Sequence, residues 1–143
     1  MSARLVSGPG DDFQIEATVT AGTAIQKGEI LERSGNVLQR ATSSTTIHTI
    51  FGVSGEAITT AATKIKVIPI IPNAAQIWEL DTTNNEATTM RYETNVLTDH
   101  NKLDNTNSDV TGPTGVFTQI GFSGATTDKK ALGFFNKLGV TST

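Results

Sequence analysis

Two histidines are the side chains of this sequence best suited to metal binding or to acid–base chemistry. His48 and His100 both lie in polar segments rich in Thr or Asn, and neither has a Cys or Glu three or four positions later. Such a spacing would complete a metal-binding face. No Gly-x-Ser-x-Gly sequence marks a hydrolase nucleophile either. We therefore interpret both histidines as surface residues, and we expect no catalytic residue and no metal ligand.

An oxygen-rich run at residues 105–109 offers a second possible chemistry, because alternating Asn, Asn and Asp side chains can bind calcium. Val110 stands where a calcium loop of the EF-hand type needs Gly, and no Glu occupies the twelfth position of such a loop. The glycines form neither a dinucleotide-binding motif nor a P-loop. The sequence thus favours a solvated loop, a protein without a cofactor, and a function other than that of an enzyme.

Composition narrows the class of protein further. The chain has 143 residues, 24 of them Thr, and a formal net charge of −3. This length fits one domain, and abundant β-branched Thr favours strands over helices. Nucleic acid is not an expected partner, because the chain has no excess of basic residues to neutralise phosphates. A membrane is not an expected partner either, since no apolar run approaches the roughly 20 residues of a spanning helix.

The elements that must position any functional surface are predicted to be strands. Apolar and polar residues alternate over residues 13–20, as in a half-buried strand. Residues 34–36, Ser-Gly-Asn, separate two short apolar runs and predict a tight hairpin. The most apolar segment, residues 64–71, predicts a central buried strand in which Pro69 marks an edge or a bulge. Further strands are expected at residues 50–58, 76–80, 90–97, 116–122 and, in preference to a short helix, 129–138.

These patterns predict an all-β fold, a small barrel or sandwich, formed by a single domain over residues 13–143. Residues 1–12 contain turn-forming and charged residues but no hydrophobic period, so we expect them to form a flexible N-terminal arm. Residues 98–115 contain just two aliphatic side chains larger than Ala and are expected to form a long exposed loop.

Residues 20–58 follow an order of small residues and turns that resembles a known family. Gly22 and Thr23 follow a small residue, Lys-Gly-Glu-Ile-Leu comes next, and a hairpin through Ser-Gly-Asn leads into a Thr-rich stretch. Phe-Gly-Val-Ser-Gly-Glu-Ala-Ile then occupies residues 51–58. In this order, with the Thr-rich link and the apolar segment that follow, the sequence resembles the head decoration proteins of tailed bacteriophages, of the lambda type or related to it.

The resemblance implies a non-enzymatic structural protein of the virion, made in the host cytoplasm and added to the exterior of the capsid. Such subunits form homotrimers at three-fold or quasi-three-fold positions, bind the major capsid protein and stabilise the expanded shell. The resemblance also implies that the N-terminal arm orders on the shell as an added strand. The candidate capsid-binding residues are therefore Ser2, Arg4, Leu5, Val6 and Phe13.

Two other classes of protein remain open. The phrase Gly-Thr-x-Ile-x-Lys-Gly-Glu-Ile-Leu also resembles SAF-type and barrel-sandwich domains, but Lys27 and Lys64 lack the neighbours expected of a carrier lysine. A glycan-binding β-sandwich module of a phage tail, a fibre or a cell surface would instead use Trp78, Tyr92 and the loop at residues 99–109 as its sugar site.

Overall fold

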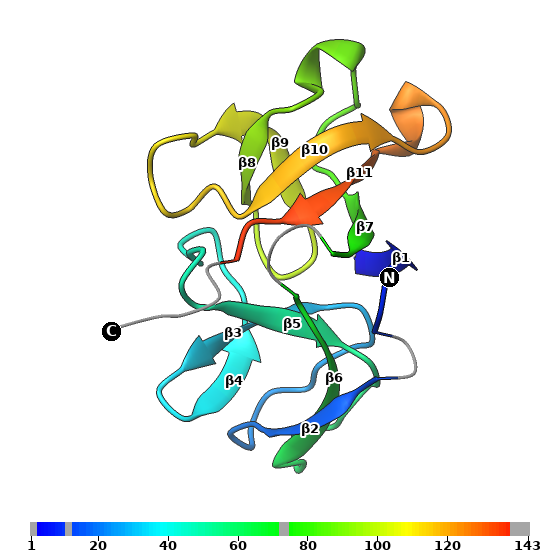
Figure 1. Cartoon of the computed structure of the whole chain (residues 1–143). Helices are drawn as coiled ribbons and strands as arrows, with labels where there is room; N and C mark the ends of the chain where they lie inside the picture. Colours follow the sequence, from blue (N-terminus) through cyan, green and yellow to red (C-terminus); the bar gives the residue numbers. More distant parts are fainter. Residues whose placement is uncertain (1–2, 11–12, 72–74, 138–143) are drawn as a thin grey trace.

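The computed structural model describes residues 3–10, 13–71 and 75–137. Over those residues the chain forms eleven strands and two short 3-10 helices, η1 (Thr88–Met90) and η2 (Thr126–Asp128), and no α-helix. Figure 1 shows two layers, with a six-stranded sheet above a five-stranded sheet. The all-β prediction is confirmed, and of the two expected architectures the sandwich is the one that fits.

The six-stranded sheet contains the first and the last strand of the described chain. Its order is β1 (Ala3–Ser7), β7 (Ile77–Asp81), β11 (Lys130–Phe135), β10 (Phe117–Phe122), β8 (Thr94–Leu97) and β9 (Leu103–Ser108). Every neighbouring pair is antiparallel. Beyond β7 the chain passes along β9, where Thr82 forms an isolated parallel bridge with Leu103. The sheet therefore curls around its inner face without closing into a barrel.

The five-stranded sheet is also antiparallel throughout. Its order is β2 (Ile15–Thr18), β6 (Lys64–Pro69), β5 (Ile50–Ser54), β3 (Ile30–Ser34) and β4 (Val37–Arg40). An isolated parallel bridge between Val19 and Leu38 brings the two edges of this sheet together. Gly35 has a φ of 63° between β3 and β4. This left-handed conformation suits Gly in a tight turn, and the predicted hairpin is confirmed.

The main core lies between the two sheets. The five-stranded sheet contributes buried aliphatic residues, namely Ile30, Ile50, Val53 and Ile68. The six-stranded sheet contributes larger side chains, among them Trp78, Leu80, Leu97, Leu103, Phe117 and Phe135. The Phe135 ring packs edge-on against Trp78 and Phe117, with centroids 5.5 Å and 5.1 Å away. This shared apolar interface holds the two layers together.

A second core, whose buried members are all aliphatic, lies on the other face of the five-stranded sheet. Its buried members are Val19, Ile25, Leu31, Leu38, Ile65 and Val67. In β6, Ile65 and Val67 enter this second core, whereas Ile68 and the following Ile70 enter the main core. Because β6 becomes buried on both faces, residues 64–71 begin as an alternating pattern and then become continuously apolar.

The expected N-terminal arm differs from the structure, because Ala3–Ser7 forms an edge strand rather than a free segment. β1 runs antiparallel to β7 with Ala3 opposite Leu80, and Ala3 is buried. Just two of its side chains, Ala3 and Leu5, contact the main core. So short an apolar pattern carries no detectable period, which is why the sequence predicted a flexible arm here.

The expected loop at residues 98–115 is also wrong in part, because Leu103–Ser108 forms β9 and pairs with β8. Leu103 and Asn105 are fully buried. A buried amide satisfied by other polar groups cannot be told from a solvated one in a hydrophobicity pattern.

Three smaller predictions are settled by the strand order and by the bounds of the elements. β6 is second in its sheet, so it is an interior strand but not the central one, and Pro69 is its last residue. The strand expected at residues 90–97 begins at Thr94, because η1 occupies the preceding segment. The strand preferred for residues 129–138 is confirmed as β11.

Candidate interaction surface

The N-terminal segment holds the candidate capsid-binding residues, and the structure places them on two elements. Arg4, Leu5 and Val6 lie in β1, at the edge of the six-stranded sheet. Phe13 lies just before β2, an edge strand of the other sheet. Ser2 lies outside the described residues. The segment thus spans both layers of the sandwich rather than extending from one of them.

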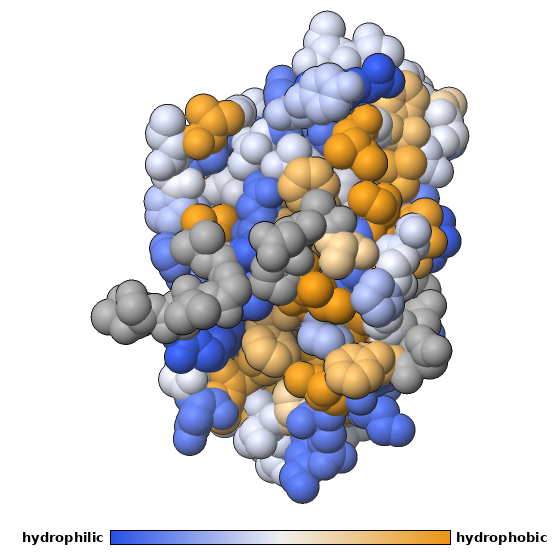
Figure 2. All heavy atoms as spheres, in the orientation of Figure 1, coloured by the Kyte–Doolittle hydropathy of each residue, from blue (hydrophilic) through white to orange (hydrophobic). Residues whose placement is uncertain are grey.

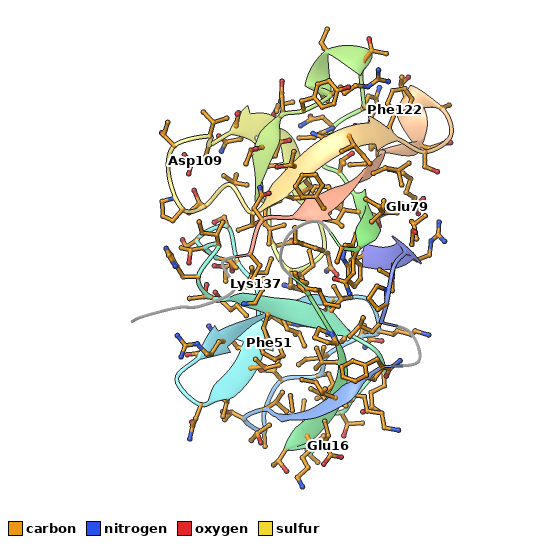
Figure 3. All side chains as sticks on the ribbon, in the orientation of Figure 1. Glu16, Phe51, Glu79, Asp109, Phe122 and Lys137 are labelled. Carbon is orange, nitrogen blue, oxygen red and sulfur yellow. The ribbon has the colours of Figure 1, made fainter. Side chains whose placement is uncertain are left out.

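Three of the four described candidates are accessible to a partner. Val6 is 45% exposed and Phe13 is 62% exposed, whereas Leu5 packs against the main core. The Arg4 side chain is 54% exposed, and its Nη2 atom lies 3.1 Å from Oε2 of Glu79 on β7, the residue labelled beside β1 in Figure 3. An exposed ion pair of this kind adds little to stability. Arg4, Val6 and Phe13 are therefore available for contact, and Leu5 anchors the strand.

Gln76 fixes the chain that follows β1, a role that no sequence pattern predicted. Its Nε2 atom donates to the carbonyl oxygens of Pro9 at 2.7 Å and Pro69 at 2.9 Å. Its Oε1 atom accepts from the backbone N–H of Ile71 at 2.8 Å and from Nε1 of Trp78 at 3.3 Å. A fully bonded buried amide rigidifies the groups around it. The N-terminal segment is thereby tied to both sheets.

Gly8 allows the segment to approach the chain closely at the end of β1. It has a φ of 103°, and a Cβ atom there would lie 2.3 Å from the backbone oxygen of Ala75. No L-amino acid side chain fits at that distance, and few adopt that conformation. The Ser-Gly-Pro-Gly run is thus a turn packed closely against the chain, although in sequence it resembles a linker.

The outer edge of β1 has a small hollow beside it. The N–H of Ala3 points away from β7 and donates to the carbonyl oxygen of Gly28 at 3.0 Å. By the alternation of an antiparallel pair, the backbone groups of Leu5 face the same outer edge, where no further strand of the described chain follows. The hollow has a volume of about 190 Å³ and is lined by residues that include Leu5, Lys27, Gly28, Ile68 and Trp78.

Figure 2 shows that apolar surface is gathered along the middle and right of this face, among hydrophilic residues. The edge of a sheet that has no further strand beside it can pair with an extended peptide, because backbone groups supply affinity and side-chain hollows supply selectivity.

The two histidines lie in segments where hydrogen bonds hold the local structure. The backbone oxygen of His100 accepts from the N–H of Ile30 at 2.9 Å, which docks the β8–β9 turn on β3. Its Nε2 atom lies 3.5 Å from Oε2 of Glu29, a buried carboxylate that also pairs with Arg40 at 3.0 Å. The region of His48 is a hydrogen-bonded turn in which its N–H donates to Oγ1 of Thr46. Over the described residues, no group of three His, Cys, Asp or Glu side chains could hold a metal ion.

The oxygen-rich run uses its last carboxylate to order its own loop. Asp109, labelled on the loop between β9 and β10 in Figure 3, accepts from the hydroxyl and the N–H of Thr114 and from the N–H of Gly112. The hydrogen bond from the Thr114 hydroxyl, helped by that from Gly112, lowers the pKa of Asp109. Asn105 lies in β9 with its side chain buried, so the alternating oxygens do not converge on one exposed point.

The sugar site expected of a glycan-binding module is not formed in the predicted way. Trp78 is 1% exposed and packs against Phe135, so its ring cannot stack on a sugar. Tyr92 is 75% exposed and has a φ of 71°. Of the two aromatic residues predicted for the site, only Tyr92 is at the surface.

Searches of protein-family models and of curated proteins give no match to this chain. None of the helices over the described residues has the length and the apolar character needed to cross a bilayer.

Proposed function

We propose that this protein is a non-enzymatic structural protein that binds the outer surface of a tailed-phage capsid. In this role it acts as a homotrimer at three-fold positions, contacts the major capsid protein and stabilises the expanded shell. The sequence resemblance supplies the class of protein. The all-β sandwich is compatible with this class of protein, because its two packed sheets form a stable body on which exposed side chains and a strand edge can contact a partner.

The observation that supports this function best is the N-terminal segment, which is fixed to both sheets. It offers the exposed side chains of Arg4, Val6 and Phe13 to a partner, and Gln76 fixes the backbone at Pro9, between Val6 and Phe13. A surface that is ordered before binding loses less conformational entropy on association than a free arm would lose. A capsid loop can add to the outer edge of β1 as a strand, with the exposed side chains giving selectivity.

Binding of this kind would stabilise a shell by mass action. A ligand that binds the expanded lattice but not the unexpanded one shifts the equilibrium toward the expanded state by an amount set by its concentration and affinity. A trimer adds to this effect, because three linked contacts dissociate far less readily than one.

The test is co-sedimentation of the purified protein with expanded, undecorated heads of a matched tailed phage, with unexpanded proheads alongside. Saturable binding to expanded heads alone is expected. The mass of the bound species, measured on released protein after cross-linking, is expected to be that of a trimer. Absence of binding to every matched head would overturn the proposal.

Point variants locate the interface more sharply than a deletion. Removing residues 2–12 would also remove β1 and the Pro9 contact with Gln76, so lost binding could reflect lost structure. Val6→Asp and Phe13→Asp change exposed side chains, and each is expected to weaken head binding at least tenfold while leaving thermal unfolding unchanged. Val110→Asp is the matched control, because Val110 is 75% exposed and lies between β9 and β10, outside the N-terminal segment. Equal binding by all three variants would remove the N-terminal segment from the interface.

The same preparation tests the glycan-binding alternative. That function would rest on Tyr92, which is the exposed member of the predicted aromatic pair. Binding to a glycan array that is lost in Tyr92→Ala, together with no binding to heads, would favour a carbohydrate-binding module.

A further inference from the structure

Four buried polar side chains gather on the inner face of the six-stranded sheet. Glu86 lies just before η1, and Asn95, Asn105 and Gln119 come from β8, β9 and β10. All four are at most 3% exposed. Buried polar groups cost free energy unless each finds a partner, so their hydrogen bonds restrict their protonation states.

One contact in this cluster joins two oxygen atoms. Asn105 donates from Nδ2 to Oε2 of Glu86 at 2.5 Å, and Gln119 donates from Nε2 to Oδ1 of Asn95 at 2.6 Å. The other end of the Gln119 amide, its Oε1 atom, then lies 2.6 Å from Oε1 of Glu86. Two oxygens at this distance require a hydrogen between them.

Reversing the Gln119 amide would place its nitrogen beside Glu86 and supply that hydrogen, but the neighbouring amide would then be affected. The Gln119 oxygen would then face Oδ1 of Asn95, so Asn95 would have to reverse as well. In its present orientation Asn95 donates from Nδ2 to the backbone oxygen of Asn107 at 3.2 Å and to Oε1 of Glu93 at 3.4 Å. Reversal would place oxygen against both of those oxygens. A proton on Glu86 provides a donor for every one of these hydrogen bonds, and neither amide has to be reversed.

We propose that Glu86 is a neutral carboxylic acid in the folded protein, that it donates a hydrogen bond to Gln119, and that its ionisation loosens the segment from Glu86 to Glu93. Burial raises the pKa of Glu86, and the charge of Glu93 raises it further, while the hydrogen bond from Asn105 opposes them. Both the hydrogen-bond geometry and the burial therefore favour the protonated form.

The charged groups on the surrounding elements provide little electrostatic stabilisation for an ionised Glu86. β8 and β10 contain no titratable side chain. On β9, Asp104 is negative and accepts from Thr106. Arg91, beyond η1, is exposed, and Asp128 in η2 is an exposed carboxylate that accepts from the N–H of Ala125. No ion pair of Glu86 forms among the described residues.

The segment that would loosen is held through Gln119 at one end and through Glu86 at the other. The N–H of Tyr92 donates to the backbone oxygen of Gln119 at 2.7 Å, and the N–H of Gln119 donates to that of Glu93 at 2.9 Å. The N–H of Glu86 donates to the backbone oxygen of Thr126 at 2.9 Å. Tyr92 is the one Tyr of the sequence, so this exposed loop has its own spectroscopic reporter.

The direction of the pH effect follows from the raised pKa. Between the ordinary Glu value of 4.5 and the higher folded-state value, the closed segment holds one proton more than the open segment. The stabilisation from Glu86 is therefore fully present below the ordinary value and is lost as the pH rises through the folded-state pKa. Within this window, protection of the Tyr92 and Gln119 amides against hydrogen exchange should fall by up to about tenfold per pH unit.

The direct test is a ¹³C titration of the Glu86 side-chain carboxyl by NMR in the full chain, with amide exchange of Tyr92 and Gln119 followed at the same pH values. A midpoint above 4.5, with protection falling across the window, is expected. A midpoint at or below that value would overturn the neutral acid. A raised midpoint with constant protection would overturn the release of the segment.

Two variants provide controls for the same measurement. Glu86→Gln keeps the shape and a donor toward Gln119 but cannot ionise, so its amide protection should not change across the window. Glu93→Gln removes the neighbouring charge and should lower the Glu86 midpoint in an otherwise unchanged chain. The second variant keeps the proposal testable even if the first fails to fold, and an unshifted midpoint there would contradict the assigned role of Glu93.

Discussion

The second core and the polar cluster fill similar curled sheets with opposite chemistry. The buried members of the second core are Val, Ile and Leu alone, and they need no particular partner. The polar cluster places Glu86, Asn95, Asn105 and Gln119 at the same kind of inward position. Apolar burial depends on area and packing, whereas each buried polar group depends on a specific neighbour. The comparison therefore separates a region that is robust to pH from one that is sensitive to pH.

The largest expected effect comes from placing a charge in the main core, which both sheets share. Ile68→Asp should abolish cooperative folding, because an unpaired buried carboxylate costs several kcal/mol, on the order of the total stability of a domain. Circular dichroism during heating measures this loss. Ile120→Asp is the control, since Ile120 is 38% exposed, and it should unfold cooperatively. A cooperatively folded Ile68→Asp protein would contradict the placement of the core.

A smaller but still large effect is expected in the second core. Leu31→Ala should lower the free energy of unfolding by about 2–5 kcal/mol, from lost burial and the cavity left behind. Urea unfolding measures this change, and the loss should be the same at each pH because no titratable group is involved. A pH-dependent loss would blur the distinction between the two regions.

In the polar cluster, Asn105→Ala should cost about 1–3 kcal/mol, the usual penalty for leaving a buried partner unsatisfied. It should also raise the pKa of Glu86, because the hydrogen bond from Asn105 favours the ionised form. Urea unfolding and the carboxyl titration check the two effects, with the exposed Asn107→Ala as control. Additive effects of Asn105→Ala and Glu86→Gln would show that the pair is not coupled.

The smallest effect is expected in the Asp109 loop, where the sign of the pH dependence is reversed. The pKa of Asp109 is lowered by the Thr114 hydroxyl, so its contribution is present above the ordinary value of 3.8 and is lost as the pH falls through the folded-state pKa. Amide exchange at Gly112 and Thr114 should therefore quicken in acid relative to neighbouring amides. Asp109→Asn should remove this acid response, and a response that persists in the variant would exclude Asp109 as its source.

Sequence patterns predicted much of the five-stranded sheet and less of the six-stranded sheet. The alternation before Thr20 predicted β2, and the Ser-Gly-Asn turn predicted the β3–β4 hairpin. Each pattern depends only on residues that are close together in sequence. β9 was missed because Asn105 is buried through contacts with Glu86, which is distant in sequence. A predicted sugar site failed for a related reason, since burial of Trp78 depends on Phe135.

The sequence proposed residues for the interaction surface but did not predict the structure that holds them. Arg4, Val6 and Phe13 are exposed, whereas Leu5 packs against the main core. Their rigid support was missed, because Gln76 acts on Pro9 across 67 positions of sequence. Long-range hydrogen bonds of single side chains leave no periodic signal.

The sequence by itself determined the all-β class, the turns and most of the aliphatic core, since β-propensity, turn chemistry and hydrophobic period act over a few residues. The tertiary structure alone decided that the N-terminal segment contains an edge strand, that buried amides surround Glu86, and which side chains of that segment are exposed. Those outcomes depend on groups brought together from distant positions, where one polar side chain is buried only because another satisfies it.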